Sequence, residues 1–183
     1  MLVGLTGLKR SGKDTFAQAL IDQGFELVRF ADPLKEMLRT LYRCAGLDEE
    51  TIERKIEGDL KEKSCPILCG KTPRHAMQTL GTEWRDMIGR DLWTLIWTGK
   101  VDQLEAEGRD VVTPDVRFHH ETAPLKRREG LVVRIERPGQ KNKDLHVSET
   151  EMMAIEPNEV VLNDGTIEDL HQKAKDLIND YRG

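Results

Sequence analysis

The residues best suited to chemistry stand near the start of the chain, in the segment GLKRSGKDT at 7–15. Gly7, Gly12 and Lys13 have the spacing of the phosphate-loop pattern G-x-x-x-x-G-K. Glycines let successive backbone N–H groups turn toward an anion, and the helix that follows adds positive potential. The segment therefore predicts a nucleotide site in which Lys13 reaches the terminal phosphates of a nucleoside triphosphate. The loop residues expected to contact that nucleotide are Lys9, Arg10, Ser11, Gly12, Lys13, Asp14 and Thr15.

Magnesium is the metal that such a loop would hold together with the phosphates. The pattern normally continues with Ser or Thr, whose hydroxyl binds Mg²⁺, but Asp14 stands at that position here. The role can pass to the hydroxyl of Thr15, or Asp14 can act through a bound water, and both alternatives stay open. Because hard oxygen ligands suit Mg²⁺, the candidate metal ligands are Thr15, Asp14 and Asp115.

The predicted elements on both sides of the loop support this interpretation. Residues 2–5 form a short apolar run bounded by glycine, which is typical of a buried strand. After the loop, apolar residues recur at helical spacing from Phe16 to Ile21, and Gly24 supplies a stop. A glycine-rich turn before an ordinary surface helix is the alternative, but strand, loop and helix together are what phosphate binding requires.

A second candidate segment is VVTPDVR at 111–117, which we predict to be a central strand that ends in an acid and a base. In an open parallel sheet, ligands bind beyond the carboxyl ends of the strands. Asp115 and Arg117 are two positions apart, so in a strand their side chains would leave on the same face. We therefore expect both near the phosphate loop, Asp115 as a metal ligand and Arg117 as a phosphate ligand. A surface ion pair at the strand end is the alternative.

The remaining pattern predicts an α/β protein with a doubly wound parallel sheet. Strands are expected at about 2–5, 25–30, 111–117, 131–135 and 160–162, with helices between them. The long helical interval 32–108 then forms a lobe inserted between the second and third strands. The core comprises about 1–31 and 109–183, within a single domain.

Cap signals mark the start of several helices. Thr72-Pro73 pairs a capping residue with a proline in the first turn, and Thr166 and Asp169 have the spacing of a capping box. A helix beginning at Asp91 is expected to carry Leu92, Leu95 and Ile96 on one face. The three tryptophans of the lobe (84, 93 and 97) are expected mainly in the core. The charged segment 48–63 is expected to be a solvated helix followed by a loop.

Composition excludes several function classes. With 33% charged and 38% hydrophobic residues, the chain is typical of a globular protein. Its net charge of −5 argues against wholesale binding to nucleic acid or membranes, and no apolar run approaches the length of a membrane span. Three cysteines make no disulfide framework. We expect the cysteines to be free thiols. The alternative is a zinc site on Cys65, Cys69 and His75, but the spacing of these residues is poor for zinc. We expect a cytoplasmic protein.

One segment is positively charged, in contrast to the negative net charge of the whole chain. Between 126 and 144 there are seven basic and three acidic residues, a local charge of +4 in a chain that is −5 overall. A positive segment beside a phosphate loop would attract polyphosphate. For any single member, a solvated surface position is the alternative.

Eight short motifs resemble those of bacteriophage deoxynucleoside monophosphate kinases, in the family's order and over nearly the whole chain. They are SGKDT at 11–15, FADPLK at 30–35, TPR at 72–74, QTLGTEW at 78–84, PDVR at 114–117, RPGQK at 137–141, HVSE at 146–149 and NDGT at 163–166. Pro124 and the charged insert 48–70 depart from the pattern.

The resemblance implies transfer of the γ-phosphoryl group of ATP to a deoxynucleoside 5′-monophosphate, with Mg²⁺ as cofactor. It implies a three-layer P-loop kinase fold, in which a parallel five-stranded sheet is flanked by helices and an inserted helical lobe covers the acceptor. The partners would be small-molecule nucleotides, neither nucleic acid nor membrane. The location would be the host cytoplasm if the protein is phage-encoded. A homodimer is one option for an oligomeric state that the sequence does not determine.

The resemblance also assigns roles to residues. Catalysis would fall to Lys13, Arg117 and Arg137, with Arg137 acting from a short lid. Residues 163–166, including Asn163 and Gly165, would lie near the adenine of ATP. The candidates for acceptor binding are Phe30, Lys35, Arg74, Gln78, Trp84, Arg85, Asp115 and Arg117.

This chemistry suits the residues present. An acceptor phosphate is already largely dianionic near neutral pH, so the reaction needs alignment and charge neutralisation more than a strong base. A GTPase-type switch is one alternative, because DMIG at 86–89 matches D-x-x-G, although in a helical pattern and without N-K-x-D. A kinase for dephospho-coenzyme A is another. Its hydroxyl acceptor would need a general base, for which Asp14 is available.

Overall fold

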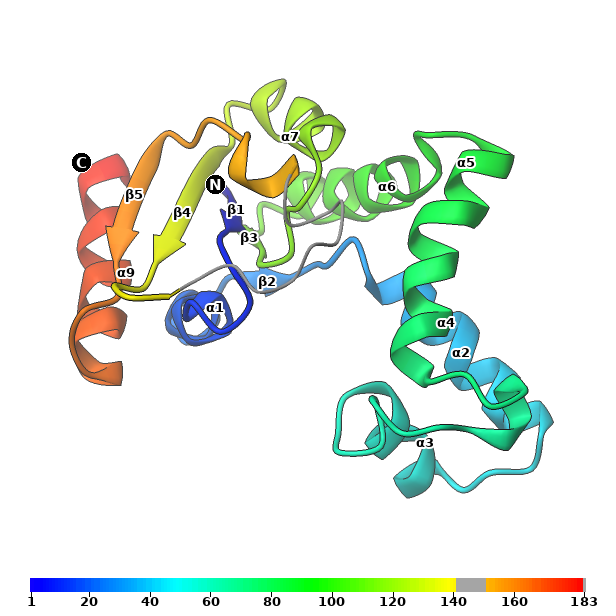
Figure 1. Ribbon diagram of the computed structural model, residues 1–183. Helices are drawn as coiled ribbons and strands as arrows, with labels where there is room; N and C mark the ends of the chain where they lie inside the picture. The colour runs from blue at the N-terminus through cyan, green and yellow to red at the C-terminus, as the bar shows by residue number, and fades with distance from the viewer. Residues whose placement is uncertain (141–150, 183) are drawn as a thin grey trace. The chain divides into compact units, whose positions relative to one another are not determined.

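The computed structural model describes residues 1–140 and 151–182. The chain divides into two compact units (Figure 1). One, here called the sheet unit, comprises Met1–Phe30 and Trp97–Gly183, and the other, the helical unit, comprises Ala31–Ile96. In the described ranges, no helix has the length and apolar character needed to cross a membrane.

The sheet unit is built on five parallel strands. They are β1 (Leu2–Thr6), β2 (Glu26–Leu27), β3 (Val111–Thr113), β4 (Leu131–Glu136) and β5 (Glu159–Leu162). Their order in the sheet is β2-β3-β1-β4-β5, so β1 is central and every neighbouring pair is parallel. This arrangement confirms the predicted α/β class with a parallel five-stranded sheet.

Successive side chains of a strand point to opposite faces, and both faces of this sheet are buried because helices pack on each. On one face, Val3 and Leu5 of β1 join a core with helices α1 (Lys13–Ile21) and α9 (Ile167–Arg182). On the other face, Leu2 lies in a second core with α6 (Leu92–Ala106) and α7 (His119–Lys126). Helices therefore flank the sheet on both sides (Figure 1).

Two predicted strands are shorter than expected. The second strand covers only Glu26–Leu27 of the predicted 25–30. The third ends at Thr113, because Pro114 has no N–H to extend the ladder, and residues 114–115 form a turn. The prediction that Asp115 and Arg117 share the face of a strand is therefore wrong, since neither residue is in a strand.

The helical unit packs its own small core. Its elements are α2 (Asp32–Cys44), α3 (Glu49–Ile56), the 3₁₀ turn η1 (Pro66–Leu68), α4 (Pro73–Thr79), the π-helical segment η2 (Leu80–Trp84), α5 (Arg85–Ile88) and the first turn of α6. The core residues are Leu38, Tyr42, Ile52, Ile56 and Cys65. The charged segment is thus more than a solvated helix, because Ile52 and Ile56, one turn apart on α3, are both fully buried.

The caps predicted at Thr72 and Thr166 are confirmed, whereas Asp32, which precedes Pro33 and which we also expect as a cap, is the first residue inside α2 rather than its N-cap. The Thr72 hydroxyl accepts a hydrogen bond from the backbone N–H of His75 at 3.1 Å, and Pro73 opens α4. At α9, Thr166 Oγ1 accepts from the N–H of Asp169 at 3.1 Å, and the Asp169 carboxylate accepts from the N–H of Thr166 at 2.9 Å. This reciprocal pair is the capping box expected from the sequence.

The buried face of α6 differs from the prediction. Leu95 and Ile96 are exposed, whereas Trp93, Trp97, Val101 and Leu104 are buried. The larger aromatic side chains occupy the inward positions because they bury more apolar area there. Trp97 stacks on Phe30 with ring centroids 4.9 Å apart, and its indole N–H donates to Thr113 Oγ1 at 3.0 Å.

Candidate phosphate-binding site

The phosphate loop joins the end of β1 to the start of α1. Gly7, Arg10 and Gly12 have positive φ angles of 138°, 67° and 109°. A Cβ added at Gly7 would lie 2.3 Å from the Ile135 carbonyl oxygen, and one at Gly12 would lie 2.5 Å from Asn163 Nδ2. Two constraints therefore favour glycine at both positions of the motif: the positive φ angle and the lack of space for a side chain.

Lys13 lies within the curve of this loop. Its Nζ donates hydrogen bonds to the carbonyl oxygens of Gly7 at 2.6 Å and Leu8 at 2.8 Å. The backbone N–H of Ser11 closes the loop by donating to the Leu8 carbonyl at 3.0 Å. The ammonium group and the N-terminus of α1 therefore create positive potential at one point, where a phosphate would be attracted.

Two amide side chains brace the loop from the segments that follow β4 and β5. Asn163 Nδ2 donates to the Ser11 carbonyl at 2.8 Å, and the backbone N–H of Asn163 donates to the Glu136 carbonyl at 2.7 Å. Gln140 Nε2 donates to the carbonyl of Lys9. Asn163 thus contacts the loop backbone, a role that the sequence did not predict. Gly165 lies in the turn that leads to α9.

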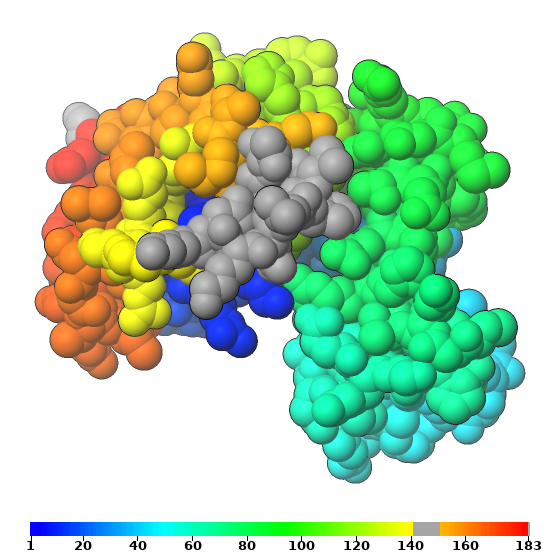
Figure 2. Space-filling view, viewed as in Figure 1, coloured from blue at the N-terminus to red at the C-terminus, as the bar shows by residue number. Residues whose placement is uncertain are grey.

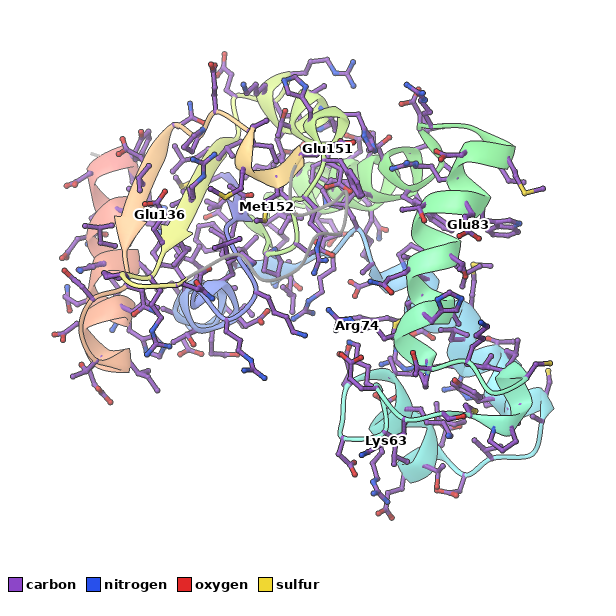
Figure 3. All side chains as sticks on the ribbon, viewed as in Figure 1. Lys63, Arg74, Glu83, Glu136, Glu151 and Met152 are labelled. Atoms are coloured by element: carbon purple, nitrogen blue, oxygen red, sulfur yellow. The ribbon has the colours of Figure 1, made fainter. Side chains whose placement is uncertain are left out.

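A pocket opens between the loop and the end of β4. Figure 2 shows the start of the chain, in blue, beside the yellow segment around residues 131–140. Glu136, which is labelled in Figure 3, is the last residue of β4 and lines this pocket. The residues that line the pocket are Gly7, Leu8, Arg134, Ile135, Glu136, Arg137, Gln140 and Met153. Arg137 is therefore close to the start of the phosphate loop.

The described part of the positive segment 126–144 is only partly directed to this pocket. Arg128 pairs with carboxylates of α6, and Arg134 donates to the carbonyls of Met153 and Ile155. Both arginines thus have structural partners, although Arg134 also lines the pocket. The predicted positions Lys141 and Lys143, and the motif at 146–149, lie outside the described residues.

The turn that follows β3 lies at the carboxyl edge of the sheet. The backbone N–H of Val116 donates to the Leu5 carbonyl at 3.1 Å, which holds this turn against the end of β1, where the phosphate loop begins. Asp115 Oδ1 accepts from the backbone N–H of Phe30 at 3.1 Å. Asp115 is partly exposed and Arg117 is exposed. The hydrogen bonds thus bring Asp115 and Arg117 to the strand ends beside the loop.

Glu121 is a buried carboxyl group that no sequence pattern indicated. Its Oε2 accepts hydrogen bonds from the backbone N–H groups of Arg117 at 2.7 Å and Phe118 at 3.0 Å. Burial raises the pKa of Glu121 to about 8, and the nearby Asp115 carboxylate adds to the shift. A glutamate three residues after a capping position is a helix-start signal, but the capping position here is Phe118 rather than Ser or Thr.

This pKa predicts how stability depends on pH. Between about pH 4.5, where an unfolded glutamate titrates, and about pH 8, the folded chain keeps the Glu121 proton and the unfolded chain releases it. The contribution of Glu121 to stability is therefore present at low pH and falls as pH rises through this window. Denaturant unfolding should show Glu121→Gln gaining stability relative to the parent from about pH 5 to pH 8. Glu168→Gln is the control, and a constant difference for Glu121→Gln would contradict the prediction.

The acceptor candidates divide between the two units. Phe30 belongs to the sheet unit, and its buried ring stacks on Trp97, so it acts there as a core residue. Asp115 and Arg117 also belong to the sheet unit, whereas the remaining candidates belong to the helical unit: Lys35, Arg74, Gln78, Trp84 and Arg85.

In the helical unit the cationic candidates face carboxylates. Lys35 Nζ lies 2.6 Å from Glu57 Oε1 and is largely buried. Arg74, labelled in Figure 3 at the start of α4, lies 3.1 Å from Glu62 Oε1. Arg85 donates to Asp86 at 2.9 Å. The backbone carbonyl of Gln78 accepts from the Thr82 hydroxyl. Trp84 is exposed, and its ring centroid lies 6.1 Å from that of Trp93.

Comparison with known proteins gives one consistent result. A family model described as "Deoxynucleotide monophosphate kinase" matches residues 48–174. A protein of Acanthamoeba polyphaga mimivirus, provisionally named a deoxynucleotide monophosphate kinase, is 35% identical over 187 residues, which cover 94% of this chain and 93% of that protein. The deoxynucleotide monophosphate kinase of enterobacteria phage T4 is 27% identical over 240 residues, covering 97% of this chain and 98% of the phage protein.

Solved structures agree on the fold. Dephospho-CoA kinase from Campylobacter jejuni superposes with a TM-score of 0.54, covering 98% of this chain and 96% of that chain at 15% identity. At this level of identity, the likeness concerns the arrangement of the elements alone. It supports a parallel sheet flanked by helices of the kind seen in that kinase.

Proposed function

The chain belongs to the deoxynucleotide monophosphate kinase family, and from this premise we propose that it transfers the γ-phosphoryl group of ATP to a deoxynucleoside 5′-monophosphate. The observation that carries the proposal is similarity to two such proteins over more than nine-tenths of the chain. The phosphate loop supports it, since loop, Lys13 and helix N-terminus are arranged as phosphate binding requires.

The chain's part in the reaction is alignment and charge neutralisation. An oxygen of the acceptor phosphate attacks the γ-phosphorus while the bond to the ADP oxygen breaks, which yields a deoxynucleoside diphosphate. Lys13 and the loop N–H groups hold the triphosphate, and Arg117 and Arg137 neutralise charge where it develops. Lys35, Arg74 and Arg85 bind the acceptor by exchanging their carboxylate partners for its phosphate, while Gln78 and Trp84 contact its nucleoside. The helical unit thereby supplies the acceptor lobe.

The oxygen donors near the loop fit Mg²⁺. Across residues 1–140 and 151–182, no group of three or more His, Cys, Asp or Glu side chains is arranged to hold a metal. The Thr15 hydroxyl in the first turn of α1 and the Asp115 carboxylate are hard oxygen donors of the kind that bind Mg²⁺ together with substrate phosphates. When bound, the ion would neutralise phosphate charge. Asp14, which is exposed, would act through water.

We predict that Thr15→Ala and Asp115→Asn raise the magnesium concentration needed for half-maximal activity, because each removes a candidate oxygen ligand. Asp14→Asn should give a smaller shift in the same direction. The measurement is a magnesium titration of activity at saturating nucleotides, with the exposed Asp180→Asn variant as control. If all three titrations overlay that of the parent protein, the ligand assignment is wrong.

A coupled assay of ATP consumption tests the proposed function directly. The acceptors are the four deoxynucleoside monophosphates, their ribose counterparts and dephospho-coenzyme A, and GTP replaces ATP as donor in a parallel series. We expect turnover with at least one deoxynucleoside monophosphate. Turnover with dephospho-coenzyme A alone would overturn the proposal. The cytoplasmic location stays a prediction, and a homodimer stays one option for the oligomeric state.

A further inference from the structure

We propose that Glu121 is a positioning residue that holds Arg117 in place for phosphoryl transfer. The inference rests on the proposed function, because it assumes that Arg117 contacts the transferred phosphate. Glu121 itself touches no reacting group in this scheme. It is 6% exposed and binds only the backbone of the turn that carries Arg117 among the contacts described above.

The turn is anchored at four consecutive residues. The carboxylate of Asp115 accepts from the Phe30 N–H, and the N–H of Val116 donates to the Leu5 carbonyl. The next two N–H groups, of Arg117 and Phe118, both donate to Glu121 Oε2, at 2.7 and 3.0 Å. Glu121 therefore supplies two of the four anchors, one at Arg117, whose side chain must be positioned, and one at the next residue.

Removing this acceptor leaves the two amide groups without their buried partner. Both hydrogen bonds are partly buried, and an N–H that loses its acceptor there is costly, so the turn would shift until water or another acceptor reached these groups. The Arg117 side chain is exposed and long, so its position depends on a fixed backbone. A displacement of about 1 Å at a group that aligns reactants can cost on the order of a hundredfold in rate.

Both hydrogen bonds end on the same oxygen atom of Glu121. The informative variant is therefore one that keeps an acceptor oxygen at this place but carries no charge. Glutamine has one carbonyl oxygen and no charge, so it can accept both N–H groups as Glu121 Oε2 does. Burial already favours the uncharged form of Glu121 near neutral pH. Alanine removes the acceptor, and leucine removes it while filling most of the space.

The experiment compares Glu121→Gln, Glu121→Ala and Glu121→Leu, with the exposed Glu168→Ala as control, at temperatures below the melting point of each. We expect kcat to fall about tenfold to a hundredfold in the Ala and Leu variants, with KM for ATP within about twofold of the parent. Glu121→Gln should keep most of kcat. Hydrogen exchange of the Arg117 and Phe118 amides should accelerate in the Ala and Leu variants and stay slow in the Gln variant.

A double-mutant cycle decides whether Glu121 acts through Arg117. In an Arg117→Ala background, Glu121→Ala should have little further effect on kcat, since the group that it positions is already gone. An equal loss in both backgrounds, an equal loss in the Gln variant, or unchanged amide exchange would each overturn the proposal. If Glu121→Ala does not fold, Glu121→Leu replaces it in the cycle. An inactive parent protein would overturn the proposed function instead, while amide exchange would still report whether Glu121 anchors the turn.

Discussion

Replacement of Lys13 by alanine is expected to lower kcat for phosphoryl transfer by at least about a hundredfold, the scale of losing a charge contact in the transition state. Lys13 Nζ lies inside the phosphate loop, where it donates to the carbonyls of Gly7 and Leu8. The substitution removes these two hydrogen bonds from the loop. The loop conformation itself is set by its glycines, by the Ser11–Leu8 bond and by Asn163, so the fold should persist with a small fall in melting temperature.

The measurement is kcat and the melting temperature of Lys13→Ala beside those of Lys175→Ala, an exposed lysine on α9. A methionine at 13 separates the charge from the volume of the side chain, and we expect Lys13→Met to be as inactive as Lys13→Ala. Near-normal turnover in a folded Lys13→Ala protein would show that the loop is only a turn between a strand and a helix.

Arg117→Lys should keep ATP binding but lose most of kcat. The guanidinium group presents a planar set of donors that can engage donor and acceptor phosphates at once, which an ammonium group cannot reproduce. Arg117→Ala should also weaken binding of the monophosphate. Neither variant removes the backbone N–H that donates to Glu121, so the anchored turn should survive both substitutions. The changes in activity can therefore be attributed to the side chain.

Arg109 provides the matched control for Arg117. It is an exposed arginine paired with Glu26 on the surface, and a pair of this kind contributes only about 0–1 kcal/mol. Kinetic constants and melting temperatures of the Lys and Ala variants at both positions should separate the two cases. If the Arg117 variants behave like the Arg109 variants, with normal turnover and a small loss of thermal stability, Arg117 has no part in the reaction.

Much of the fold could be predicted from patterns among residues that are close together in the sequence. The caps at Thr72 and Thr166 could be predicted because they depend on contacts within three residues. The glycines of the phosphate loop could be predicted because their backbone angles exclude most other residues. Parallel pairing followed from short apolar runs separated by helices, since such runs are buried on both faces.

Contacts between distant segments could not be predicted in this way. Asn163 braces Ser11 across 152 positions of the chain, and Asp115 holds Phe30 across 85. The buried face of α6 depends on which neighbour each turn of the helix meets, so Trp93 and Trp97 replaced Leu95 and Ile96 as inward residues. No sequence pattern predicted that Glu121 is buried, because only the packed fold takes it out of water.

The amino-acid sequence was enough to predict the phosphate loop and the parallel sheet that presents it, because both follow from backbone conformation and the periodicity of burial. It also identified Asp115 and Arg117 as residues at the edge of that sheet. How these two residues are held depends on contacts between distant segments, which form only when the chain folds. The strand ends at Thr113, and from Pro114 onward its place is taken by a turn anchored by Leu5, Phe30 and Glu121, because the N–H groups that leave a strand must find partners elsewhere.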